Sequence, residues 1–143
     1  MRTRRASQAR RTFVDTSAYF ALLDADDADH ERAVTVAEHV ASERRPSFVT
    51  NYIEAEAHAL LLRKLGRAIA REWLLTARLP VLRAFPQEEE HAKAILFRHT
   101  DKDWSLCDAI SFAVLESRGA RTAFTFDRHF RQYGRFEVLG LAP

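Results

Sequence analysis

Two glutamates in one predicted helix differ in their surroundings. In residues 51–63 (NYIEAEAHALLLR), the neighbours three and four positions from Glu56 are largely apolar, whereas those of Glu54 are more polar. An unpaired ionised carboxylate on a buried face is costly, so it either takes up a proton or recruits a cation. We therefore predict that Glu56 faces inward beside a cation and that Glu54 is an ordinary surface residue.

Asp108 is a second acid at the edge of a predicted core. Residues 105–118 (SLCDAISFAVLESR) are apolar on nearly every side, which is typical of a buried helix, and Asp108 lies in its first turn. A structural role is equally plausible, because Ser105 and Asp108 have the spacing of a capping box and an acid is favoured at a helix N-terminus. The sequence leaves both roles open.

Asp15 and Asp127 each follow a short predicted strand. An Asp at the end of a strand can simply start a turn. Together with Glu56 and Asp108, however, they would form a cluster of four acids, and like charges so close are unstable without a metal ion. A divalent cation held by carboxylate oxygens accounts for all four residues. Such a cluster indicates metal-assisted phosphodiester hydrolysis, in which ions activate water and no protein nucleophile is needed.

Short apolar strands alternate with longer helical segments, and these elements must position the acids. We predict an α/β fold with strands near residues 12–15, 47–50, 80–84, 122–126 and 136–139. Helices are predicted to begin near Ser17, Asp29, Asn51, Arg67, Gln87 and Ser105, with Asp29, Asn51 and Ser105 as N-caps, and to stop at Gly66, Gly119 and Gly134. Ligands of such sheets bind beyond the carboxyl ends of the strands, where Asp15 and Asp127 lie.

The composition indicates one domain, residues 12–143, preceded by a basic arm. Five of the 22 basic residues lie within residues 1–11 without an acid among them, and we predict a disordered arm that either grips phosphates or is an inert leader. The one cysteine, Cys107, is predicted to be a small core residue and suits a reducing compartment. We find no export signal and no apolar run of the ~18–20 residues that span a bilayer, so we expect a cytoplasmic protein.

Other motifs do not fit their patterns. The acids at residues 24–29 lack the Gly and Glu that a calcium loop requires, no second His stands at metalloprotease spacing, and no Gly-rich turn follows a strand. Cys107 lacks a compelling His partner and is expected to be an inert thiol. These observations argue against EF-hand, zinc-protease, nucleotide-binding and thiol-based functions.

Four segments around the acids occur in a recognisable order: FVDTSAYFALLD at 13–24, TNYIEAEAHALLLRKLG at 50–66, DWSLCDAISFAVLESRG at 103–119 and TFDRHF at 125–130. They resemble the PIN-domain family, and most closely the VapC-type toxins of prokaryotic toxin–antitoxin pairs. The resemblance implies that Asp15, Glu56, Asp108 and Asp127 form the family's acidic quartet. It also implies a PIN-like fold with a central parallel sheet of about five strands flanked by helices, Mg²⁺ or Mn²⁺, and endonucleolytic cleavage of RNA. The expected partners are a second copy of the chain in a homodimer and a small antitoxin that inhibits the enzyme.

Supporting roles fall to residues beside the quartet. Thr16 and Ser17 are predicted to orient Asp15 through hydrogen bonds, and Asn51 and Ser105 are predicted to contact metal-bound water. Each of the four is equally credible as a helix cap. Contacts with RNA phosphates, or a solvated loop, are predicted for Arg128, His129 and Arg131. The alternatives to a toxin are a PIN-fold module that binds RNA or an antitoxin without cleavage, and a housekeeping RNA-processing nuclease.

Overall fold

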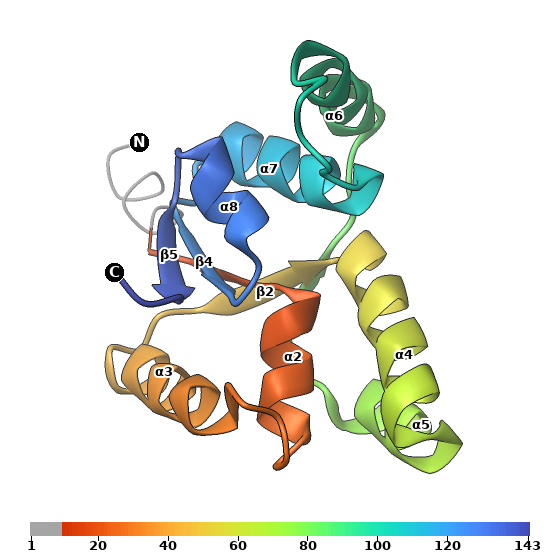
Figure 1. Cartoon of the computed structure of the whole chain (residues 1–143), viewed down its shortest axis with the longest axis vertical. Helices are drawn as coiled ribbons and strands as arrows, with labels where there is room; N and C mark the ends of the chain where they lie inside the picture. Colours follow the sequence, from red (N-terminus) through yellow and green to blue (C-terminus); the bar gives the residue numbers. More distant parts are fainter. Residues whose placement is uncertain (1–9) are drawn as a thin grey trace.

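The computed structural model describes residues 10–143, so most of the predicted basic arm lies outside the described residues. Five strands form one parallel sheet in the order β3-β2-β1-β4-β5 (Figure 1). Their bounds are β1 Thr12–Val14, β2 Ser47–Thr50, β3 Val81–Leu82, β4 Thr122–Thr125 and β5 Glu137–Gly140. The predicted α/β fold with a parallel sheet of about five strands is confirmed.

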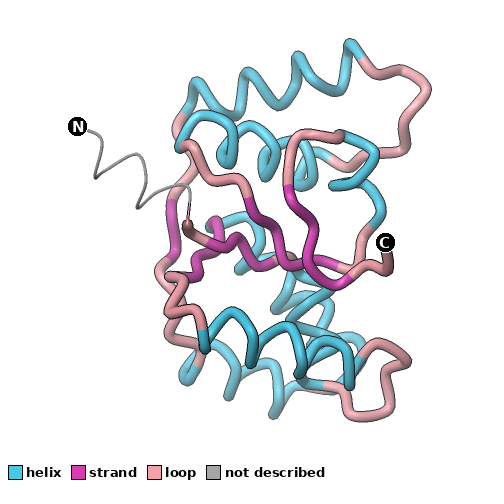
Figure 2. The backbone as a smooth tube through the Cα atoms, turned by 90° about the vertical axis from the view of Figure 1, so that its left-hand side faces the viewer, coloured by secondary structure: helices cyan, strands magenta, loops and turns pink. Residues whose placement is uncertain are grey.

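Helices cover both faces of this sheet. Helices α2 to α5 lie on one face and α6 to α8 on the other, with the sheet between the two layers (Figures 1 and 2). Their bounds are α2 Thr16–Leu23, α3 His30–Ser42, α4 Asn51–Leu65, α5 Arg67–Thr76, α6 Pro86–Arg98, α7 Leu106–Arg118 and α8 Arg128–Tyr133. Within residues 10–143, no helix is both long and apolar enough to cross a membrane.

Burial on both sides explains why the central elements are so apolar. All three residues of β1 are buried, as expected for a strand in the middle of a parallel sheet covered by helices. Helix α7 is buried over eight consecutive residues, 108–115, which confirms that it is a core helix. Phe13 of β1 stacks on Phe130 of α8, and Phe112 of α7 contacts the same ring edge to face, with centroids 5.6 and 5.0 Å away. The core therefore holds β1, α7 and α8 in fixed relative positions.

The order of the strands reverses direction between β1 and β4. From β1 the chain moves outward to β2 and β3, then crosses through α6 and α7 to β4 on the other side of β1. The connections thus leave β1 and β4 in opposite directions, and in sheets of this kind ligands bind in a crevice beyond the carboxyl ends of two such strands. We call this end of β1 and β4 the crevice. Asp15 follows β1 and Asp127 follows β4, so the topology brings them to the same place.

Two details of the predicted helices were wrong. The start of helix α8 was not predicted, although Gly134 was expected to end a helix, because its six residues carry too little apolar periodicity to be recognised. The N-cap of α4 is Thr50 rather than Asn51, since the Thr50 hydroxyl accepts the Ile53 N–H at 3.1 Å. Gly66, Gly119 and Gly134 end helices as predicted, and the last two adopt the left-handed conformation that favours glycine.

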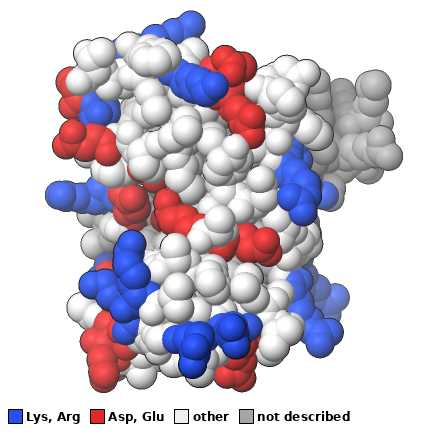
Figure 3. Space-filling model, turned by 90° about the vertical axis from the view of Figure 1, so that its right-hand side faces the viewer, with Lys and Arg blue, Asp and Glu red and all other residues white. Residues whose placement is uncertain are grey.

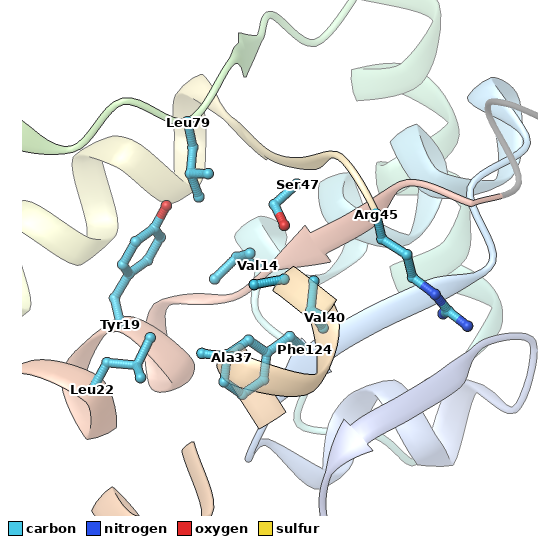
Figure 4. Close-up of a pocket in the computed structure, with 10 residues that line it drawn as sticks. Val14, Tyr19, Leu22, Ala37, Val40, Arg45, Ser47, Leu79 and Phe124 are labelled. Carbon is cyan, nitrogen blue, oxygen red and sulfur yellow. The ribbon is translucent and has the colours of Figure 1, made fainter. Parts of the chain in front are cut away.

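A pocket of about 360 Å³ lies between α2, α3 and the sheet (Figure 4). Its lining is mainly apolar, and Arg45 extends away from the apolar side chains at its edge (Figure 4). The residues that line it are Val14, Tyr19, Leu22, Ala37, Val40, Ala41, Arg45, Ser47, Leu79 and Phe124. The lining contains no carboxylate, so the chemistry predicted from the acids belongs elsewhere.

Candidate active site

Asp15 is fixed at the end of β1 by its pairing with β4. Val14 lies opposite Phe124, and the Asp15 N–H continues the ladder to the Phe124 carbonyl at 3.0 Å. One carboxylate oxygen, Oδ2, accepts two hydrogen bonds of 2.9 Å, from the hydroxyls of Ser17 and Thr125. Parallel register therefore places the Asp15 side chain directly beside the end of the neighbouring strand.

The two hydroxyls also hold the turn after β4. The backbone N–H of Phe126 donates to Ser17 Oγ, and that of Asp127 donates to Thr125 Oγ1, both at 2.9 Å. Because each hydroxyl accepts a backbone N–H, its own proton is available for Asp15. Asp15 and the backbone of Asp127 are thus joined through one shared set of hydrogen bonds.

Ser17 makes the bond to Asp15 that its position suggested, but Thr16 does not. Thr16 is buried and its hydroxyl has no hydrogen-bond partner among the described residues. Thr125 takes the role expected of Thr16, and the sequence analysis missed it. The available signal was its place in a strand adjoining β1, two residues before Asp127.

Burial dominates the electrostatics of Asp15. The side chain is 4% exposed, and burial raises its pKa from 3.8 to about 7, helped by the charges of Glu56 and Asp108. The hydrogen bonds from Thr125 and Ser17 act in the opposite direction and lower the pKa. Because the charges of Glu56 and Asp108 act on Asp15, these two carboxylates lie in its neighbourhood.

Asp108 serves as a helix cap and faces the crevice at the same time. Its Oδ2 accepts the Ser105 N–H at 3.0 Å, and its own N–H donates to Ser105 Oγ at 3.0 Å, which completes the predicted capping box. The same Oδ2 atom lies 2.8 Å from Nδ1 of His129. The two interpretations of Asp108 are therefore compatible.

Asp127 caps α8 in a similar way. Its Oδ1 accepts the His129 N–H at 2.9 Å and lies 3.3 Å from His129 Nδ1. One ligand atom each from Asp108, Asp127 and His129 can be chosen within 4.8 Å of one another. His129 was predicted to touch RNA phosphate; in the structure its ring contacts two carboxylates. Arg128 and Arg131, predicted for the same role, are both exposed.

The argument that Glu56 faces inward was wrong. The buried stripe of α4 is Ile53, Ala57 and Leu61, and Glu56 is exposed whereas Glu54 is half-buried. Neighbours at three and four positions were apolar around Glu56, but the stripe that packs is centred one residue further along. Glu56 is nevertheless near enough to Asp15 for its charge to raise the pKa of that carboxyl.

Cys107 packs against the core from its edge, so its predicted core position is confirmed in part. It is half-buried, and burial raises the pKa of its thiol far above its usual value, with the charge of Glu56 and a hydrogen bond to it as further causes. A thiol so firmly protonated is a poor nucleophile, which agrees with its expected inertness.

The side chains of Asn51 and Ser105 accept hydrogen bonds from backbone N–H groups. Asn51 Oδ1 accepts the Ala84 N–H at 3.0 Å, joining α4 to the segment between β3 and α6. Ser105 caps α7. Their predicted contacts with metal-bound water remain predictions.

The buried acids differ in whether a basic side chain neutralises them. Among the described residues, three acids are buried: Asp15, Glu88 and Asp108. Glu88 has a guanidinium partner, Arg118, at 2.8 Å. Asp15 has no basic partner among the described residues, and Asp108 has only His129. An uncompensated cluster of carboxylate oxygens fits a divalent cation, which prefers such donors.

The surface agrees with this assignment. Acidic side chains form a band across the middle of one face, and Lys and Arg lie around it (Figure 3). This face is the right-hand side of Figure 1, where the first turns of α4 and α7 lie close together. A negatively charged crevice would repel RNA phosphates unless a cation neutralised it.

Comparisons with known proteins agree with the geometry. The PIN domain family model matches residues 12–136. The chain is 35% identical over 129 residues to the 23S rRNA-specific endonuclease VapC20 of Mycobacterium tuberculosis, covering 88% of this chain and 96% of the relative. It is 29% identical over 136 residues to ribonuclease VapC26 of that organism, covering 88% and 98%.

Solved structures give the same result. The crystal structure of Mycobacterium tuberculosis VapC20, described as a sarcin-ricin loop cleaving toxin, matches with a TM-score of 0.78 at 34% identity, covering 90% of this chain and 98% of that one. The DNA-bound VapBC structure from Salmonella typhimurium matches with a TM-score of 0.66 at 16% identity over 90% and 96%, which shows the fold alone. The chain belongs to the PIN-domain family and, within it, to the VapC group.

Proposed function

We propose that this protein is a VapC-type toxin, an endoribonuclease that uses Mg²⁺ or Mn²⁺ and is inhibited by a small antitoxin. The observation that carries the proposal is the convergence of Asp15, Asp108 and Asp127, with Glu56 near Asp15, on the crevice beyond β1 and β4. The similarity to VapC20 and VapC26, whose names describe an endonuclease and a ribonuclease, supports the same activity.

In this proposal the quartet Asp15, Glu56, Asp108 and Asp127 holds the cation. An ion held by these carboxylates would supply activation of the attacking water and charge stabilisation of the leaving oxygen of the phosphodiester. Asp15 Oδ1, Asp108 Oδ1 and Asp127 Oδ2 make no hydrogen bond to the described residues, so they are available as ligands. Asp108 Oδ2 and Asp127 Oδ1 each accept one backbone N–H and keep a further lone pair, so these two carboxylates can also bind an ion through the oxygen that faces His129. The cleaved RNA would carry 5′-phosphate and 3′-hydroxyl ends.

Ser17 and Thr125 act through Asp15. The hydrogen bonds from Ser17 and Thr125 to Oδ2 fix the orientation of the Asp15 carboxylate and leave Oδ1 free to bind other partners. In this proposal Arg128 and Arg131, both exposed on α8, contact RNA phosphates. The protonated thiol of Cys107 takes no part as a nucleophile.

The proposed partners are an antitoxin and a second copy of the chain. Structures of VapBC from Salmonella typhimurium and of VapBC2 from Rickettsia felis, both bound to DNA, share this fold. Large apolar side chains that are largely exposed, such as Leu75 and Phe97, support an interface with another chain. Light scattering of the purified protein tests the homodimer, and co-purification with the product of the adjacent gene tests the antitoxin.

RNA cleavage by the purified protein tests the activity. We expect a 23S rRNA fragment containing the sarcin-ricin loop to be cut in Mg²⁺ or Mn²⁺ and left intact in chelator. Asp127→Asn should abolish cleavage, whereas Asp101→Asn, at an exposed aspartate outside the crevice, should not. A protein that binds RNA tightly but never cuts it in either metal would favour the binding-module alternative.

A further inference from the structure

His129 lies between two of the proposed ligands. Its Nδ1 atom is 2.8 Å from Asp108 Oδ2 and 3.3 Å from Asp127 Oδ1, and its side chain is 29% exposed. The carboxylates come from different elements, since Asp108 is in the first turn of α7 and Asp127 precedes α8. One imidazole nitrogen is therefore within ligand distance of both acids.

The position of this imidazole is built into the fold. Asp127 holds the start of α8 by accepting the His129 N–H at 2.9 Å. The next residue, Phe130, is fully buried and packs against the rings of Phe13 and Phe112. Because these contacts anchor the first turn of α8, His129 is not a loosely held surface residue.

The distances from His129 Nδ1 to the two carboxylate oxygens suit ligands of a single metal ion. Bonds from a first-row metal to carboxylate oxygen or imidazole nitrogen are about 2.1 Å long. Neighbouring ligand atoms on one ion are then about 3.0 Å apart in octahedral and about 3.4 Å in tetrahedral geometry. The two measured separations, 2.8 and 3.3 Å, lie close to these values. A cation could replace the imidazole proton that now lies between nitrogen and oxygen.

We propose that His129 is itself a metal ligand through Nδ1, which rests on the metal-dependent function proposed above. The site then prefers Mn²⁺ to Mg²⁺. Mg²⁺ binds oxygen donors, keeps several waters and gains little from an imidazole. Mn²⁺ belongs to the first-row series whose members bind mixed nitrogen and oxygen sites. The imidazole thereby sets which divalent ion this crevice selects.

Metal binding to the full chain, measured without RNA, tests the proposal. Calorimetry gives the Mn²⁺ and Mg²⁺ affinities, and electron spin-echo modulation of the Mn²⁺-loaded protein detects a directly bound imidazole nitrogen. We expect the nitrogen signal in the wild type and in the control His91→Ala, whose histidine is exposed on α6. His129→Ala should lose the signal and roughly 10-fold to 100-fold in Mn²⁺ affinity, while Mg²⁺ affinity changes less than about 3-fold.

A second variant separates ligation from hydrogen bonding. In His129→Asn the amide N–H₂ can replace Nδ1–H as the donor to Asp108, but it offers no nitrogen lone pair to a metal. We expect His129→Asn to lose the Mn²⁺ preference as His129→Ala does. Retention of the preference in His129→Asn, or equal losses of Mn²⁺ and Mg²⁺ affinity in both variants, would overturn the proposal.

The outcomes also distinguish this proposal from the proposed function. A wild-type protein that binds Mn²⁺ with the imidazole signal but never cleaves RNA would refute the nuclease assignment and leave His129 as a ligand. A wild-type protein that cleaves RNA in Mn²⁺ without an imidazole signal would refute the role of His129 alone.

Discussion

Replacing Asp15 with asparagine should stabilise the metal-free protein at neutral and alkaline pH. Burial raises the pKa of Asp15 from 3.8 to about 7. For an acid whose folded pKa is raised, the stability is fully present below the unfolded pKa and is lost as pH rises through the folded pKa. The loss therefore falls between about pH 4 and pH 7. Asparagine does not ionise, and its amide oxygen can still accept the bonds from Ser17 and Thr125.

The size of the effect follows from the two pKa values. A difference of about three pH units corresponds to about 4 kcal/mol at full ionisation, at about 1.4 kcal/mol per unit. At pH 5 the wild type has lost only about 1.6 kcal/mol of this, so the advantage of Asp15→Asn should grow by about 2.5 kcal/mol between pH 5 and pH 8. For a domain of this size that is an increase of roughly 10 °C in the difference between the melting temperatures.

Thermal and denaturant unfolding in chelator, at pH 5 and pH 8, measures this difference. Saturating Mn²⁺ at pH 8 should raise the melting temperature of the wild type and raise that of Asp15→Asn much less, because the variant lacks a charged ligand. Unfolding curves of the two proteins that stay the same distance apart at both pH values would rule out a raised pKa of Asp15 in the folded protein. They would mean that Asp15 is solvated or paired in the metal-free protein.

Further variants test the other parts of the site. Glu56→Gln should lower the rate of RNA cleavage at least 10-fold and Glu54→Gln less than 2-fold; equal losses with folding retained would remove Glu56 from the site. Ser17→Ala should weaken Mn²⁺ binding, measured by calorimetry, about 10-fold, whereas Thr16→Val should leave it unchanged, and the reverse order would contradict the hydrogen bonds described above. Gly140→Ala should destabilise the protein by more than 1 kcal/mol in urea, because φ is +116° and an added Cβ would lie 2.6 Å from a backbone oxygen of β4; wild-type stability would show that β5 shifts freely.

Periodicity was sufficient to predict the sheet and most of the helices. The five strands are short apolar runs between turn residues, and a parallel α/β arrangement follows from their alternation with helices. The beginning of helix α8 was not predicted, because the helix is stabilised by Phe130, whose contacts with Phe13 and Phe112 depend on the tertiary fold. Local pattern carries no information about such packing.

The site was predicted only in part, for a similar reason. Asp15 and Asp127 could be placed together because strand ends meet at one edge of a parallel sheet. The burial of Glu56 was misjudged, since helical neighbours do not reveal which stripe faces the core. The hydroxyl of Thr125 and the imidazole of His129 join the site through contacts between distant segments, which spacing along the sequence does not show.

We propose above that the crevice beyond β1 and β4 holds the divalent ion that drives RNA cleavage. One measurement tests it directly: the rate of RNA cleavage is followed as Mn²⁺ is added to metal-free protein, beside the calorimetric binding curve under the same conditions. We predict that the Mn²⁺ concentration for half-maximal cleavage equals the dissociation constant within about 2-fold, and that Asp127→Asn loses both binding and cleavage. Cleavage that persists in chelator, or that Asp127→Asn retains after losing the metal, would contradict the account.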